Sequence, residues 1–155
     1  MPRIIVLDSF PLSAIGKNRS TPPSVTDHCR QWIMNCIAAG NHVRVPAIVY
    51  YETIRELERL NASAQIARLK AFCFTDPARF IPLETAHLEV AAKLWGQARN
   101  AGMPTASPEA LDGDVILAAQ ALSLGVSAPN LIVATTNPAH LSRFIAADLW
   151  TNIQP

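Results

Sequence analysis

Four polar side chains stand just past short apolar segments or early in amphipathic ones, where side chains of distant segments can meet. They are Asp8, Glu52, Asp114 and Asn137. Three of the four are carboxylates, whose oxygen atoms are the hard ligands that Mg²⁺ and Mn²⁺ prefer. The fourth is an amide, which can orient a water molecule or an anion but adds no negative charge. If the four converge, they are suited to hydrolysis assisted by a divalent metal ion.

Each of these residues also has an ordinary structural interpretation. Asp8 suits a turn or a helix cap at the end of a strand. Glu52 suits a solvated helix carboxylate that is paired with Arg55 or Arg59. Asp114 suits the beginning of a helix, where the helix dipole favours an acid. Taken alone, none of these residues predicts a site.

Two neighbouring positions are ambiguous in the same way. Asp112 is a further candidate acid, but it also fits the N-cap of the helix that carries Asp114. Because residues two positions apart do not share a face of a helix, Asp112 ranks below the other three acids. Asn137 is followed by Pro138, a pair that is typical of a turn and a helix start.

Apolar periodicity predicts the elements that must position these side chains. Continuous apolar segments predict buried strands, and apolar residues at three- and four-residue steps predict helices. The predicted strands cover residues 4–7, 43–45, 80–83 and 131–134, with a last edge strand around 149–150 and 153. The predicted helices cover residues 11–15, 25–39, 46–60, 62–72, 85–99, 111–124 and 138–144, and residues 103–108 are predicted to form a loop. Since strands alternate with helices, the predicted fold class is α/β with a mostly parallel sheet.

The sheet also predicts where a site belongs. In open parallel sheets, ligands bind at the carboxyl ends of the strands, near the point where the strand order reverses. Asp8 follows the first predicted strand, and residues 135–137 follow the strand predicted at 131–134. These two segments are therefore expected to lie at the same functional edge.

Length and composition limit the other possibilities. With 155 residues, the chain has the length of one domain, and residues 1–155 are expected to form it. Half of the residues are apolar and 16% are charged, which argues against a disordered chain. The net charge of +1 excludes a strong overall basic field, so any contact with nucleic acid must be local. No apolar segment is long enough to predict export or a membrane span.

The three cysteines do not indicate a metal site. Cys29, Cys36 and Cys73 lack the spacing that is typical of zinc ligands. We expect them to be reduced, buried thiols, as in a cytosolic protein.

Four segments, taken together and in order, resemble the PIN-domain family, including its VapC-like toxin branch. Residues 4–9, IIVLDS, are similar to the family's first strand and first acid. Residues 45–52, VPAIVYYE, resemble its second block, a strand, a proline and a helix with the second acid. Residues 114–121, DVILAAQA, resemble the third block, an acid that leads an alanine-rich helix. Residues 131–141, LIVATTNPAHL, resemble the fourth, a strand followed by a T-x-N-x-x-H pattern.

This resemblance implies a three-layer α/β/α fold with a central, mostly parallel sheet. It implies a metal-dependent endoribonuclease that uses Mg²⁺ or Mn²⁺ to hydrolyse phosphodiester bonds in RNA. The VapC-like branch further implies the toxin of a toxin–antitoxin pair, a cognate antitoxin that covers the acidic cleft, a homodimer and a cytoplasmic location. The alternative is a PIN-like module with a weakened site that serves as an RNA-binding or protein-binding scaffold.

The resemblance also implies a role for each candidate catalytic residue. Asp8, Glu52 and Asp114 carry over as the acidic cluster that holds the metal ion. Glu52 would in addition orient or deprotonate the attacking water. Asn137 would act with Thr135 to position the phosphate.

Ser9 and Arg143 are further candidates for contact with RNA. Three more basic residues could contact the RNA backbone, although most such residues are ordinary surface charges: Lys17, Arg19 and Arg55. The sequence departs from the family pattern at two places. Asn137 stands where the family has a fourth acid, so a second metal ion would be held less firmly. Phe10 stands where relatives often have a polar side chain.

Two other α/β classes fit these residues less well. A phosphotransferase of the haloacid dehalogenase type would use Asp8 as its nucleophile, and it generally has another Asp two residues later, where this chain has Phe10. A nucleotide-binding Rossmann domain requires a glycine-rich loop after the first strand, and this sequence lacks one. The scaffold alternative stays open because Asn137 removes a charge, whereas the three retained acids favour an enzyme.

Overall fold

Five parallel strands form the central sheet of the computed structural model, which describes residues 2–102 and 108–155. The strands are β1 (Ile4–Leu7), β2 (His42–Pro46), β3 (Phe80–Ile81), β4 (Leu131–Thr135) and β5 (Ala147–Leu149). Their order across the sheet is β3-β2-β1-β4-β5. Every neighbouring pair is parallel, so the prediction of a mostly parallel sheet is confirmed, and the sheet is in fact parallel throughout.

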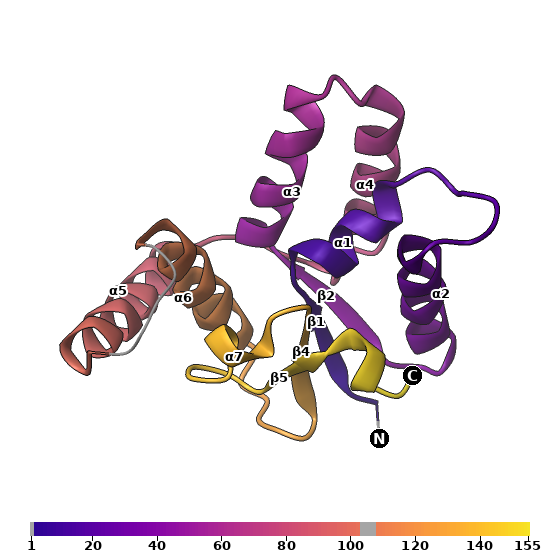
Figure 1. The fold of residues 1–155 in the computed structure, drawn as a ribbon. Helices are drawn as coiled ribbons and strands as arrows, with labels where there is room; N and C mark the ends of the chain where they lie inside the picture. Colours follow the sequence, from indigo (N-terminus) through magenta and orange to yellow (C-terminus); the bar gives the residue numbers. More distant parts are fainter. Residues whose placement is uncertain (1, 103–107) are drawn as a thin grey trace.

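Helices flank this sheet on both sides. The helix α2 lies on one side, and α5 and α6 lie on the other (Figure 1). The helices are α1 (Ser9–Gly16), α2 (Val25–Ala38), α3 (Ala47–Arg59), α4 (Ser63–Thr75), α5 (Thr85–Asn100), α6 (Pro108–Leu122) and α7 (Pro138–Leu141), with a 3₁₀ helix η1 (Trp150–Asn152). The expected three-layer α/β/α architecture is therefore confirmed.

Several predicted boundaries are wrong: the strand predicted at 80–83 ends at Ile81 and the helix predicted at 138–144 ends at Leu141, and two further differences lie near the site and at the sheet edge. The helix α6 begins at Pro108, three residues before its predicted start, and the rest of the predicted loop, 103–107, lies outside the described residues. The edge strand is Ala147–Leu149, which pairs with β4, and the chain turns into η1 at Trp150. Alanine and aspartate have low strand propensity, so only the pairing with β4 makes this segment a strand.

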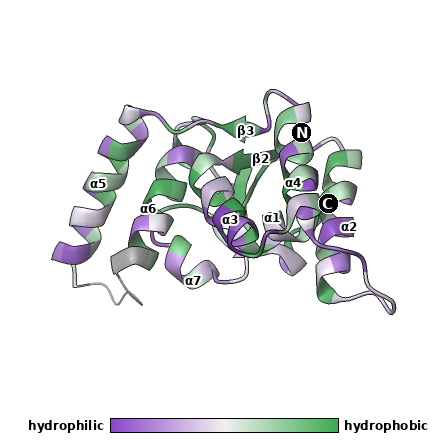
Figure 2. Cartoon of the chain, turned by 90° about the horizontal axis from the view of Figure 1, so that it is seen from above, coloured by the Kyte–Doolittle hydropathy of each residue, from purple (hydrophilic) through white to green (hydrophobic). Residues whose placement is uncertain are grey.

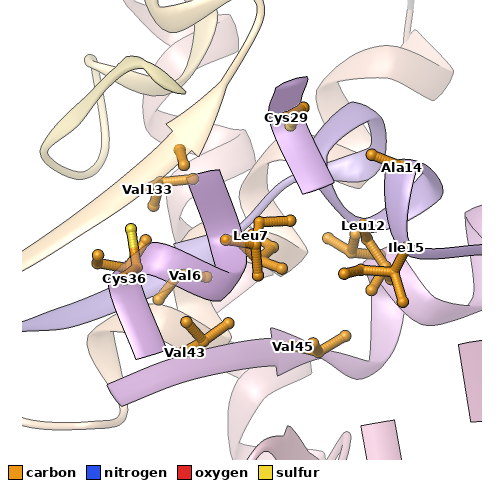
Figure 3. Packing of buried hydrophobic residues seen from close by; sticks show 14 of the residues in the cluster. Val6, Leu7, Leu12, Ala14, Ile15, Cys29, Cys36, Val43, Val45 and Val133 are labelled. Carbon is orange, nitrogen blue, oxygen red and sulfur yellow. The ribbon is translucent and has the colours of Figure 1, made fainter. Parts of the chain in front are cut away.

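The first strand lies at the centre of the hydrophobic core. Ile5, Val6 and Leu7 are fully buried between β2 and β4. Figure 3 shows Leu7 in one cluster with Leu12 of α1 and Val45 of β2. Figure 2 shows mostly hydrophobic colours on the strands and both kinds of colour on the helices, as expected for helices with one buried face. Because β1 is buried on both faces, a shift of its register would be costly, and the residue that follows it is fixed in place.

One buried polar side chain, Gln120 of α6, ties together the helices that carry the candidate acids. Gln120 is 0% exposed. Its Oε1 accepts a hydrogen bond of 3.1 Å from the backbone N–H of Ile48, and its Nε2 donates one of 2.9 Å to the carbonyl of Ile81. Since α3 carries Glu52 and α6 carries Asp114, Gln120 fixes the beginning of one helix against the other.

Gln120→Ala should destabilise the protein by about 2–4 kcal/mol, because it opens a cavity and removes the hydrogen bonds to the part-buried N–H of Ile48 and to the carbonyl of Ile81. Chemical denaturation monitored by circular dichroism measures this free energy of unfolding. The matched control is Gln97→Ala, at an exposed position of α5, with an expected change within about 0.5 kcal/mol. Equal destabilisation by the two substitutions would contradict the structural role of Gln120.

The three cysteines are free and buried, as predicted. Burial raises the pKa of Cys29 and of Cys73 to about 12 and that of Cys36 to about 11, so they stay protonated and are poor metal ligands or nucleophiles.

Within residues 2–102 and 108–155, no helix has both the length and the apolar character needed to cross a bilayer.

Candidate functional site

Asp8 is held at the carboxyl end of β1 by three hydrogen bonds. It is the N-cap of α1, and its Oδ1 accepts a hydrogen bond of 2.8 Å from the backbone N–H of Ser9. Its Oδ2 accepts one of 2.7 Å from the hydroxyl of Thr135, at the end of β4. Its own N–H donates to the carbonyl of Ala134 at 3.0 Å. The cap interpretation of Asp8 is thus correct, and the same contacts fix the direction of its carboxylate.

Thr135 and Asn137 form the neighbouring turn after β4. Thr135 is fully buried, and its Oγ1 accepts a hydrogen bond of 3.1 Å from the backbone N–H of Asn137. Its hydroxyl therefore faces Asp8 and the turn, whereas the sequence predicted contact with substrate. Asn137 is exposed and stands at the N-cap position of α7, but its side chain makes no capping bond there.

Glu52 lies on α3 and is half-buried. The side-chain hydroxyl of Ser9, the residue that follows Asp8, donates a hydrogen bond to the carboxylate of Glu52. Of the predicted alternative partners, Arg59 is engaged elsewhere, whereas Arg55 stays close enough to Glu52 to lower its pKa. Arg59 pairs with Glu56, and the guanidinium of Arg55 lies 5.2 Å from the ring centroid of Tyr51. The interpretation of Glu52 as a solvated, salt-bridged carboxylate is therefore not supported.

Asp114 lies well inside α6. The helix begins at Pro108, so Asp114 is past the first turn, where the effect of the helix dipole on an acid has faded. Its side chain is 26% exposed. Asp112 is also inside the helix and is exposed, so the interpretation of Asp112 as the N-cap is wrong. The structure thus removes the ordinary explanation for an acid at position 114.

The ionisation of Asp114 reflects the charges around it. The pKa of Asp114 is raised to about 6, first by burial and then by the nearby carboxylate of Asp8, while His140 and Arg143 oppose this change. The Nδ1 atom of His140 lies 3.9 Å from Oδ2 of Asp114 and 3.3 Å from Nδ2 of Asn137. Asn137 therefore reaches the acidic cluster through His140, the histidine of the T-x-N-x-x-H pattern.

The pKa of Glu52 also reflects the nearby charges of the other two acids. Burial raises the pKa of Glu52, and the charges of Asp8 and Asp114 raise it further, whereas Arg55 and the hydrogen bond from Ser9 lower it. Three carboxylates, one just after β1, one on α3 and one on α6, therefore lie within electrostatic reach of one another. The structure brings together the acids that the sequence selected, and it leaves Asp112 exposed beside them.

The three acids do not by themselves form a closed metal cage. Among residues 2–102 and 108–155, no three His, Cys, Asp or Glu side chains are arranged closely enough to hold a metal ion directly. Mg²⁺ commonly binds through one or two carboxylates and keeps several waters, so a closed cage is not required for it. Clustered carboxylates also repel one another, and this repulsion from Asp8 adds to the larger effect of burial in raising the pKa of Asp114. The donor set, partly buried carboxylate oxygen atoms with excess negative charge, fits a hard divalent cation.

Glu52 borders two hollows in the surface. One, of about 560 Å³, extends over α1, α3 and α4 and is lined by Ser9 and Lys17, among others. The other, of about 350 Å³, lies between α3 and α6 and is lined by Arg55 and Gly113, among others. Glu52 is therefore accessible to a ligand larger than an ion, with a basic side chain, Lys17 or Arg55, in each hollow.

Comparison with known proteins identifies the family. Residues 24–143 match the model of the PIN domain, so the chain belongs to the PIN-domain family. The matched region contains Glu52, Asp114 and Asn137, and Asp8 lies before it. Comparison with curated protein sequences gave no match.

Several solved structures share this fold. VapBC-1 from nontypeable Haemophilus influenzae has a TM-score of 0.65 and 19% identity, covering 96% of this chain and 99% of that chain. FitAcB from Neisseria gonorrhoeae has a TM-score of 0.66 and 20% identity, with coverage of 96% and 99%. VapBC2 from Rickettsia felis, bound to a DNA fragment from their promoter, has a TM-score of 0.64 and 16% identity, with coverage of 95% and 98%. At these identities, the similarity is one of fold.

Proposed function

We propose that this protein is a metal-dependent endoribonuclease and the toxin of a toxin–antitoxin pair. Members of the PIN-domain family are typically nucleases. The observation that carries the proposal is the convergence of the carboxylates of Asp8, Glu52 and Asp114 at the carboxyl ends of the parallel strands. Two of these acids have raised pKa values, and such perturbed acids in a cleft are typical of functional sites.

The acidic cluster would hold Mg²⁺ or Mn²⁺. When bound, such an ion polarises the phosphate and makes water a stronger nucleophile near neutral pH. Asp8, held by Ser9 and Thr135, would be a ligand of fixed direction. Asp114 would be the second ligand, directly or through water. The cation would also relieve the repulsion between these two acids.

The other residues of the site would bind and orient the reactants. Glu52 would accept a proton from the attacking water, because its raised pKa makes it a stronger base than an ordinary carboxylate. Arg143, beside Asp114, would contact the RNA phosphate. Asn137, exposed at the rim, would donate a hydrogen bond to the same group. Ser9 would orient Glu52 as well as contact the RNA.

The protein partner follows from the solved relatives. The relatives in VapBC-1, VapBC2 and FitAcB belong to toxin–antitoxin complexes, so we propose a cognate antitoxin that covers the acidic cleft of this chain. A basic side chain of that antitoxin placed among the carboxylates would replace the cation. We also propose a homodimer and a cytoplasmic location, as the family resemblance implies.

A second candidate function is a non-catalytic PIN-like scaffold that binds RNA or protein. The amide of Asn137 favours it, because an amide contributes no negative charge. The scaffold should bind no Mn²⁺ with useful affinity, whereas the enzyme should bind it in a single specific event. A calorimetric titration with Mn²⁺ therefore separates the two functions.

Mapping of RNA ends tests the nuclease proposal. The purified protein is incubated with structured RNA in the presence of Mg²⁺ or Mn²⁺, and in parallel with EDTA. We expect cleavage only with metal, and ends that carry a phosphate monoester, because water is the nucleophile. Cleavage that resists EDTA, or ends with a 2′,3′-cyclic phosphate from attack by the ribose hydroxyl, would contradict the proposal.

The pKa of Asp114 predicts how metal binding depends on pH. A carboxyl group must lose its proton to bind a cation, and a pKa of about 6 leaves Asp114 ionised at pH 7.5 and mostly protonated at pH 5. The affinity for Mn²⁺ should therefore fall by at least about 10-fold between these two values. In Asp114→Asn the dependence on pH should be smaller. A wild-type affinity that stays constant over this range would contradict the assignment of Asp114 as a ligand.

A further inference from the structure

Gly113 occupies a helix interior where the backbone does not require glycine. It lies within α6, one residue before Asp114. The glycines with a positive φ angle are Gly40, Gly102 and Gly125, and Gly113 is not among them. Alanine is the better helix former at such a position, so another contact must explain why glycine stands here.

That contact is with the carboxylate of Glu52. A Cβ atom added at position 113 would lie 2.9 Å from Oε1 of Glu52, 3.7 Å from its Cδ and 3.9 Å from its Oε2. The first of these distances is shorter than the contact between a carbon and an oxygen atom that are not bonded. The bare α carbon of Gly113 therefore leaves the space that the carboxylate of Glu52 occupies.

Two residues set the position of the Glu52 carboxylate, and each of them is next in sequence to one of the other two acids. Ser9, which bonds the Glu52 carboxylate, follows Asp8. Gly113, which makes room for it, precedes Asp114. The carboxylate of Glu52 thus reaches from α3 between α1 and α6, with an acid beside each of its two contacts.

We propose that Gly113 is a positioning residue of the active site, whose missing side chain lets the Glu52 carboxylate lie against α6 beside Asp114. This inference rests on the proposed function, because that function gives Glu52 its catalytic purpose. The atom that the methyl group of an alanine would displace is Oε1, at the end of the flexible Glu52 side chain, and this side chain can rotate away. A methyl group at position 113 therefore moves the carboxylate and leaves the fold intact.

Gly113→Ala is compared with Gly96→Ala, a matched control in the interior of α5 where an added Cβ meets no atom within 4 Å. Because both substitutions remove glycine from a helix, Gly96→Ala should raise the melting temperature by about 2–4 °C, and Gly113→Ala should leave it unchanged or raise it. Only Gly113→Ala should lower kcat/KM for RNA cleavage, by about 100-fold and mainly through kcat, since the reacting group is misplaced.

A double-mutant cycle tests whether the effect passes through Glu52. Glu52→Asp withdraws the carboxylate by one methylene and clears the space near position 113. The cost of Glu52→Asp should therefore be much smaller in the Gly113→Ala background than in the wild-type background. If the fold-losses in kcat/KM of the two single variants simply multiply in the double variant, the two residues act independently. This result would overturn the inference.

Two further measurements separate this inference from the proposed function. If Glu52→Gln cleaves RNA like the wild type, the catalytic role of Glu52 fails and the inference fails with it. If Glu52→Gln is inactive and Gly113→Ala cleaves at the wild-type rate, only the inference about Gly113 is overturned. Calorimetry with Mn²⁺ gives a readout without cleavage, since Gly113→Ala should bind about 10-fold more weakly and Gly96→Ala should not change. Equal affinity in Gly113→Ala and the wild type would overturn the inference.

Discussion

Asp8→Asn should lower kcat/KM for RNA cleavage by about 10³-fold, which corresponds to a loss of about 4 kcal/mol of transition-state stabilisation. The substitution removes one negative charge from the acidic cluster and changes the shape of the side chain very little. Asparagine is as good an N-cap as aspartate, so α1 should keep its cap and the amide oxygen can still accept the hydrogen bond from Ser9. The loss should therefore be one of chemistry, with a nearly unchanged melting temperature.

The control for this substitution is Asp76→Asn, at the C-cap of α4. Its side chain is 46% exposed and pairs only loosely with Arg79, at 3.8 Å. Cleavage rates measured on the two variants, purified in the same way, also exclude a contaminating ribonuclease. Metal-dependent cleavage by Asp8→Asn at the wild-type rate would contradict the assignment of Asp8 as a metal ligand.

Asp114→Asn should have effects of opposite sign on activity and on stability. Cleavage should fall by about 10³-fold, because a metal ligand loses its charge. Stability at pH 7.5 should rise by about 1–2 kcal/mol. The pKa in the folded protein is about 6 against a usual value of 3.8, which corresponds to about 3 kcal/mol, and contact of the side chain with solvent reduces this.

The sign of this effect follows from proton binding. Between pH 3.8 and 6 the folded protein binds more protons at Asp114 than the unfolded chain does, so the ionised carboxylate destabilises the fold above pH 6. The penalty is relieved as the pH falls through 6 towards 3.8. The advantage of Asp114→Asn over the wild type should accordingly shrink to about half at pH 5.

Thermal or chemical denaturation at pH 7.5 and pH 5 measures these differences. The matched control is Asp112→Asn, two residues away on the same helix, where the side chain is exposed. Its stability should change by less than about 0.5 kcal/mol at either pH. An Asp114→Asn variant that is less stable than the wild type at pH 7.5 would show that the carboxylate is not under electrostatic strain.

The parts of the fold with strong local patterns could be predicted from the sequence. The continuous apolar segments at 4–7 and 131–134 match β1 and β4 almost residue for residue, because a strand buried on both faces must be apolar throughout. β5 escaped prediction because its pairing with β4, and not its composition, makes it a strand. The early start of α6 escaped because the predicted loop includes Pro108, although proline is favoured at the first position of a helix.

The site, like the fold, could be predicted from the sequence only in part. Asp8 could be predicted from the rule that ligands gather at the carboxyl ends of parallel strands, and the four ordered motifs selected Glu52 and Asp114. The contacts that set the geometry could not be predicted, because they join segments far apart in the chain. Gln120 bonds the beginning of α3, and Gly113 makes room for Glu52. The only local signal was a glycine inside a helical pattern, and it does not say which side chain needs the space.

A calorimetric titration of Mn²⁺ into the purified protein at pH 7.5 tests the central claim most directly, namely that the acidic cluster holds one metal ion, with Asp8 and Asp114 as its ligands. The wild type should show one specific binding event, and Asp8→Asn and Asp114→Asn should each weaken it by at least about 100-fold, or about 2.7 kcal/mol. Asp112→Asn should leave it within a factor of about 2. No binding by the wild type, or wild-type affinity in both Asp8→Asn and Asp114→Asn, would contradict the claim.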